Sequence, residues 1–151
     1  MKNFFKKFMV GFVFIVFMTV YSTAFSQQVV DEKPITDHAI IMMNSTTCSY
    51  CISFLEEGMP EWKNFQEFYK NKAGVVIPNL YILDMPPARS FPEWVISAMN
   101  DKRIPHVQGT PTFFYWDGIK VLDQVIGYGG NNTFRAIFNM SEKHGEKNGK
   151  E

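Results

Sequence analysis

The segment HAIIMMNSTTCSYC, residues 38–51, decides the predicted fold. Its first part, from His38 to Met43, is almost wholly apolar, which favours a strand buried on both faces of a sheet. The polar residues from Asn44 to Thr47 suit a turn and the cap of a helix. Two cysteines, Cys48 and Cys51, close the segment. The segment therefore predicts a buried strand, a short polar turn and a helix that begins at the first cysteine.

Helical spacing continues beyond the second cysteine. Apolar side chains recur every three or four residues, with charged residues between them, as on one face of a helix. Gly58 and Pro60 interrupt this pattern, so we expect a kink or a break there. The segment from Asn71 to Gly74 ends it. The apolar positions are Leu55, Met59, Trp62, Phe65 and Tyr69.

The rest of the chain adds three strands and two helices. A capping box, Ser90 with Glu93 three residues later, predicts a helix from Phe91 to about Asn100. Asp117-Gly118 predicts a tight hairpin turn between two strands. Strands alternating with helices imply an α/β fold with a mixed sheet covered on both faces, in the order strand, helix, strand, helix, strand, strand, helix. The remaining predicted elements are strands at 79–84, 112–116 and 119–126 and a last helix capped by Asn131 or Asn132.

The pattern of residues at the N-terminus predicts a secretory signal. Three lysines precede an apolar run from Phe8 to Met18, and small residues at Ala24 and Ser26 predict cleavage after residue 26. The alternative is an uncleaved membrane anchor, although the run is shorter than the roughly 20 residues that span a bilayer. We therefore expect an exported protein with a signal peptide at 1–26, one domain at 27–141 and a flexible polar tail at 142–151.

The charge balance argues against a nucleic-acid partner. The chain has 15 basic and 15 acidic residues, and loss of a signal carrying three lysines and no acid leaves 12 basic and 15 acidic. A nucleic-acid surface would need a clustered basic face, which this sequence does not provide.

The two cysteines suit a working redox pair better than a structural bond. Outside the cytosol disulfides persist, but a bond between residues three apart closes a very small loop and stabilises by only roughly 2 kcal/mol. Cys48 at a helix N-terminus would be stabilised as a thiolate. Cys51, one turn further on, could resolve a mixed disulfide. We expect Cys48 to be the nucleophile and Cys51 the resolving thiol, with no cofactor beyond their redox-active disulfide.

Other interpretations of the pair remain open. Zinc usually takes four ligands, and only the scattered His38, His106 and His144 could join the cysteines. Haem attachment would need histidine where the chain has Ile52. A thiol-based copper-handling or assembly factor is the leading alternative, and a non-catalytic interaction domain is a third. His106 could approach Cys48 and favour its thiolate, or lie exposed in a loop.

Over about residues 35–140 the sequence resembles the thioredoxin superfamily. The matching parts are the Cys48–Cys51 motif, the segment Val107–Phe114, the turn Trp116–Ile119 and Gly127 before the last helix. The resemblance implies a thioredoxin fold with a cis proline beside the cysteine pair, preceded by a residue whose backbone pairs with the substrate chain. It assigns substrate contacts to Ser49, Tyr50, Thr110, Pro111 and Gly127.

The chain departs from thioredoxin itself at several positions. Thr47 stands where thioredoxin has Trp, Ser49-Tyr50 replaces Gly-Pro, and the buried acid of thioredoxin aligns near Met42. A small residue plus tyrosine between the cysteines, and threonine before the proline, resemble bacterial periplasmic disulfide isomerases and thioredoxin-like periplasmic reductases. The resemblance implies a periplasmic thiol–disulfide oxidoreductase of reductase or isomerase type. Its partners would be cysteine-containing exported proteins and a membrane or periplasmic electron donor.

Overall fold

The computed structural model describes residues 33–87 and 89–145. The expected signal peptide at 1–26 lies outside these residues, as does the end of the expected tail, 146–151. Within the described residues no helix has the length and apolar character needed to cross a bilayer. The elements, in chain order, are β1 (Ala39–Asn44), α2 (Ser49–Ser53), η1 (Phe54–Gly58), α3 (Met59–Ala73), β2 (Asn79–Asp84), α4 (Glu93–Asn100), β3 (Thr112–Trp116), β4 (Val121–Ile126) and α5 (Asn131–His144).

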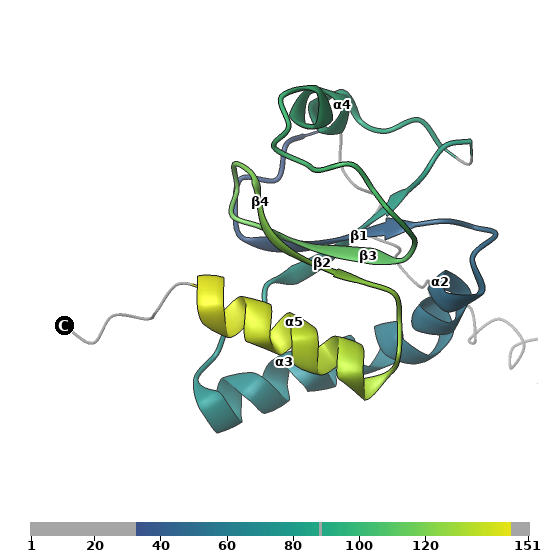
Figure 1. Ribbon diagram of the computed structural model, residues 1–151. Coiled ribbons are helices and arrows are strands. Elements are labelled where there is room, and N and C mark those ends of the chain that lie inside the picture. The colour runs from purple at the N-terminus through teal and green to yellow at the C-terminus, as the bar shows by residue number, and fades with distance from the viewer. Residues whose placement is uncertain (1–32, 88, 146–151) are drawn as a thin grey trace, which may run out of the picture.

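The four strands form one mixed sheet in the order β2-β1-β3-β4. β1 runs parallel to β2 and antiparallel to β3, which pairs antiparallel with β4. Helix α4 covers one face, while α2, α3 and α5 lie on the other (Figure 1). This arrangement is the thioredoxin fold, so the predicted fold class, element order and two-sided helix cover are confirmed.

Strand β1 is the centre of the sheet. All six of its residues are buried, because neighbouring strands pair with both edges and helices cover both faces. Ile40 and Met42 face the core under α3 and α5, whereas Ile41 and Met43 face the core under α4. The apolar run in the sequence therefore supplies two cores at once.

The long helical segment is interrupted where Gly58 and Pro60 predicted. A single π-helical turn, η1, joins the five-residue α2 to α3. Pro60 lies in the first turn of α3, where a missing N–H is tolerated. A Cβ on Gly58 would lie 2.6 Å from a ring carbon of Phe54. That ring packs edge-on against Phe113 and Tyr128, so it has little room to move.

Two of the predicted boundaries are wrong. Helix α4 begins at Glu93 rather than Phe91, and Ser90 does not cap it: Pro92 occupies the cap position, with no side-chain cap bond. A proline holds the residue before it in extended backbone, so the helix cannot include Phe91. Strand β4 begins at Val121 rather than Ile119.

The hairpin between β3 and β4 has a longer turn than predicted. The Asp117 carboxylate accepts the N–H groups of Ile119 and Lys120, at 2.8 and 2.7 Å, which closes a four-residue loop instead of a two-residue turn. Gly118 takes a φ of 93°, a value that favours glycine. The register shifts between Tyr115 and the next residue of β3.

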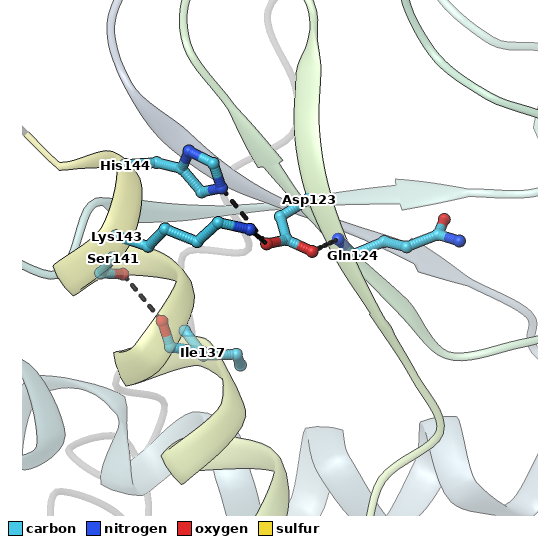
Figure 2. Close-up of polar contacts among 6 residues, drawn as sticks. All are labelled: Asp123, Gln124, Ile137, Ser141, Lys143 and His144. Atoms are coloured by element: carbon cyan, nitrogen blue, oxygen red, sulfur yellow. Dashed lines mark hydrogen bonds and ion pairs between the residues drawn. The ribbon is translucent and has the colours of Figure 1, made fainter.

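Helix α5 extends past the expected domain end at residue 141. It continues to His144, so the first residues of the predicted tail are helical. Figure 2 shows how this end is attached to the sheet: Lys143 Nζ and His144 Nε2 lie 2.9 and 3.2 Å from Asp123 Oδ2 on β4. No such long-range ion pair can be read from a polar C-terminal sequence.

Substituting Gly58 by alanine should destabilise the protein. The added methyl would overlap the Phe54 ring, and overpacking of this kind costs about 1–3 kcal/mol. Urea unfolding measures the free energy of unfolding directly. Gly129→Ala is the matched control, because a Cβ there meets nothing within 4 Å and should change stability by less than about 1 kcal/mol. Equal losses in the two variants would contradict the packing assigned to Gly58.

Candidate active site

Cys48 is the residue from which the first helix starts. It occupies the N-cap position of α2 with extended backbone, at φ −90° and ψ 117°, and its carbonyl accepts the N–H of Ile52 at 3.1 Å. The predicted start of the helix at the first cysteine is confirmed. The polar residues before it do not cap the helix as expected, because Cys48 itself holds the cap position and no side chain bonds there.

The backbone of Ser45 forms a hydrogen bond with each of the two cysteines. The carbonyl of Ser45 accepts the backbone N–H of Cys48 at 3.1 Å. The N–H of Ser45 points to the other cysteine and donates to Cys51 Sγ at 3.4 Å. Ser45 follows directly after β1, so the central strand sets the position of the turn that carries the pair.

Thr110 approaches the pair from a segment 62 residues away in sequence. The Cys48 thiol donates to the Thr110 carbonyl oxygen at 3.1 Å. The peptide bond between Thr110 and Pro111 is cis. Gly127 joins the same region, because its N–H donates to the Pro111 carbonyl at 2.7 Å. The structure thus brings together the cysteines, Thr110, Pro111 and Gly127, which the sequence placed in one site.

The pKa of Cys48 lies below its ordinary value. Partial burial of the sulfur acts in the opposite direction and raises the pKa, but hydrogen bonds outweigh it. They come from the Thr110 side chain, from the backbone and side chain of Cys51, and from the backbone of Tyr50. The Thr110 carbonyl accepts from the thiol form, whereas the Thr110 side chain favours the thiolate. The second influence, together with the helix N–H groups, makes Cys48 the easier sulfur to ionise.

Burial raises the pKa of Cys51 to about 11. Its side chain is wholly buried and belongs to the apolar core that includes Met42 and Phe54. The hydrogen bond and charge of Cys48 raise the pKa further, while the Ser45 N–H and the Thr110 side chain lower it. The two sulfurs therefore differ: an accessible one that ionises readily stands in front of a buried one that keeps its proton.

An open groove of about 390 Å³ lies beside the motif. Tyr50, 61% exposed, forms one side, and the corner between β4 and α5, which begins at Gly127, forms the other. The sequence assigned Tyr50 and Gly127 to the site but did not identify the other residues that line the groove. The glycine-rich segment before the last helix was the sequence feature that could have indicated them. The other lining residues are Val125, Ile126, Tyr128, Gly129, Asn132 and Thr133.

The three histidines do not gather at the cysteines. His106 is exposed, and the hydrogen bonds that lower the Cys48 pKa come from other residues. His38, which precedes β1, bonds Tyr115 at 2.9 Å, and His144 bonds Asp123. Among residues 33–87 and 89–145, no three histidine, cysteine or acidic side chains form a group that could hold a metal ion.

Comparison with solved structures returns thioredoxins and thioredoxin-like proteins. The periplasmic thioredoxin SoxS from Paracoccus pantotrophus is 17% identical, with a TM-score of 0.41 over 68% of this chain and 97% of its own. A thioredoxin-like protein from Clostridium perfringens is 18% identical, with a TM-score of 0.46 over 86% and 99%. A thioredoxin-fold protein from Helicobacter pylori is 16% identical, with a TM-score of 0.49 over 73% and 72%.

The sequence matches no protein-family model and no curated protein. The fold assignment therefore rests on the strand order and connections of the chain itself. Together with the placement of the two thiols, they define a Cys-x-x-Cys protein of thioredoxin fold.

Thr110→Val should raise the pKa of Cys48 and so make it less reactive at a pH below that pKa. Valine keeps the shape and the backbone carbonyl but removes the hydroxyl, so the Cys48 pKa rises and less thiolate is present. We expect the pH profile of alkylation by iodoacetamide to move to higher pH, with the rate below the Cys48 pKa falling roughly fivefold, the effect of losing one hydrogen bond of about 1 kcal/mol. The difference should vanish at a pH where both proteins are fully ionised.

Thr47→Val is the matched control for that measurement. It removes a hydroxyl next to Cys48 in sequence, but this hydroxyl lies 3.3 Å from Ser45 Oγ and does not act on the Cys48 pKa. Equal slowing in both variants would show that Thr110 has no special influence on the sulfur.

Proposed function

We propose that this protein is an exported thiol–disulfide oxidoreductase that exchanges disulfides with exported proteins through Cys48 and Cys51. The observation that carries the proposal is the difference between the two thiols. Cys48 is partly exposed with a lowered pKa, and Cys51 lies buried behind it with a pKa of about 11. An inert structural pair needs no such difference, whereas sequential attack and resolution do.

In the reducing direction the reaction has two steps. The Cys48 thiolate attacks one sulfur of a client disulfide, forming a Cys48–client bond and releasing the other client sulfur as a thiolate. Cys51 then loses its proton and attacks Cys48 Sγ, forming the Cys48–Cys51 disulfide and releasing the second client thiolate. The client gains two electrons and the protein loses two. In the oxidising direction the same steps run backwards.

The residues around Cys48 suit an extended client segment. Thr110 borders the sulfur and is the residue whose backbone would pair with the client chain, and the cis peptide bond to Pro111 follows it directly. Ser49 and Tyr50 project from the exposed start of α2. With Gly127, Tyr50 lines the groove beside the motif, which offers a largely apolar place for a client side chain near its reacting cysteine.

The proposed direction is reduction or isomerisation. A strongly oxidising pair needs an especially stable thiolate, as a neighbouring cation provides. The influences on the Cys48 pKa are burial and hydrogen bonds from Thr110, Cys51 and Tyr50, and none of these groups is a cation. A reductase would also need a membrane or periplasmic electron donor to restore the dithiol. The lysine-headed apolar segment at the N-terminus supports export to the periplasm.

Cys51→Ala should trap clients in the native compartment. With no resolving thiol, adducts formed by Cys48 persist, so non-reducing electrophoresis should show several covalent complexes that disappear when reductant is added. Cys48→Ala is the matched control and should trap none. Absence of adducts in Cys51→Ala would contradict the oxidoreductase proposal. Tight one-to-one Cu(I) binding by the reduced protein, without disulfide reduction, would instead favour metal handling.

A further inference from the structure

The resolving step depends on how Cys51 becomes a thiolate inside an apolar core. Its sulfur is wholly buried, and burial disfavours the charged form that must attack. In the described part of the chain, the neighbours that favour this charge are the Ser45 N–H, 3.4 Å from the sulfur, and the Thr110 side chain. Met42 of β1 belongs to the same core as Cys51, but its side chain is apolar and places no carboxylate beside the sulfur.

The Ser45 N–H is held in place from the residue before it. Asn44, the last residue of β1, is 4% exposed and is bonded at two points. Its carbonyl accepts the N–H of Met85 at 2.8 Å. Its side-chain Nδ2 donates to Asp84 Oδ1, opposite it on β2, at 2.7 Å. The peptide bond that carries the Ser45 N–H is therefore fixed on its Asn44 side by contacts to β2 and the turn after it.

The polar side chain of Asn44 lies at a buried position where it leaves one oxygen without a hydrogen-bond partner among the described residues. The five residues before it in β1 are apolar and buried. Asn44 Oδ1 is buried without a hydrogen-bond partner among the described residues, and an unpartnered buried oxygen lowers stability. An apolar residue would leave no unpartnered oxygen here, but it could not bond to Asp84 across the sheet.

We propose that Asn44 and Asp84 are positioning residues for the resolving step: they hold the Ser45 N–H on Cys51 Sγ, where it stabilises the thiolate that attacks the mixed disulfide. This inference rests on the proposed oxidoreductase function. In the step itself, the Cys51–Cys48 bond forms and the Cys48–client bond breaks. The client sulfur leaves with the electron pair, and the net change moves one proton from Cys51 to the client thiolate.

The test separates the two chemical steps with Ellman's disulfide, which releases one coloured thiolate on adduct formation and a second on resolution. Asn44→Leu removes the amide but keeps the size of the side chain. We expect the second phase to slow about tenfold, as for loss of a hydrogen bond to a charged group, with its pH profile displaced to higher pH. The first phase should stay within about twofold, because the hydrogen-bonding groups that lower the Cys48 pKa are unchanged.

Two variants of the partner keep the inference testable if Asn44→Leu does not fold. Asp84→Asn retains an oxygen that accepts from Asn44 and should resolve adducts at close to the original rate. Asp84→Leu loses that oxygen and should slow the second phase. Asp123→Asn is the matched control: it changes another strand carboxylate, bound by Lys143 and His144 (Figure 2), and should leave both phases unchanged.

Each result decides the question. Slowing of the second phase in Asn44→Leu and Asp84→Leu, with recovery in Asp84→Asn, supports the positioning role. An unchanged second phase, or equal slowing of both phases, overturns it, since equal slowing indicates a general structural effect. Failure of the original protein to form an adduct or to release the second thiolate would instead contradict the proposed function.

Discussion

The structure depends on the position of β1 at the centre of the sheet. This strand is paired on both edges and buried on both faces, so the residue that follows it has little freedom in where it lies. The turn from Ser45 to Cys48 starts from that fixed point, and α2 starts from the turn. Burial of the apolar strand residues thereby determines where the partly exposed Cys48 lies.

The two cysteines differ in pKa mainly because they are buried to different extents. Both belong to the same short segment, and both receive hydrogen bonds from backbone N–H groups. Cys48 lies at the open end of α2, where these bonds outweigh the cost of partial burial. Cys51 lies one turn deeper, in the apolar core that includes Met42 and Phe54, where burial is the largest influence on its pKa. One turn of helix is enough to separate a partly exposed sulfur with a lowered pKa from a buried sulfur with a raised one.

Sequence patterns predicted most of the fold and the centre of the site. Residues 38–51 predicted β1, its turn and the start of α2 because an apolar run followed by polar residues is a pattern that lies within one short segment. The predicted cap at Ser90 was wrong because Pro92 holds the cap position. The hairpin was predicted correctly, but not its turn, because the Asp117 carboxylate closes a longer loop. The bond between Asn44 and Asp84 joins two strands 40 residues apart, and no local pattern records such a pairing.

Hydrogen bonds from one threonine hold the backbone of the corner between β4 and α5 in place. The buried Thr133 hydroxyl accepts the N–H of Gly129 at 2.9 Å and donates to the carbonyl of Gly127 at 3.4 Å. These bonds tie together a glycine-rich segment that would otherwise sample many backbone conformations. One wall of the groove is thus ordered in the free protein, so binding of a peptide there would lose conformational entropy mainly from the peptide itself. A client bound as proposed would gain contact here without needing a large interface.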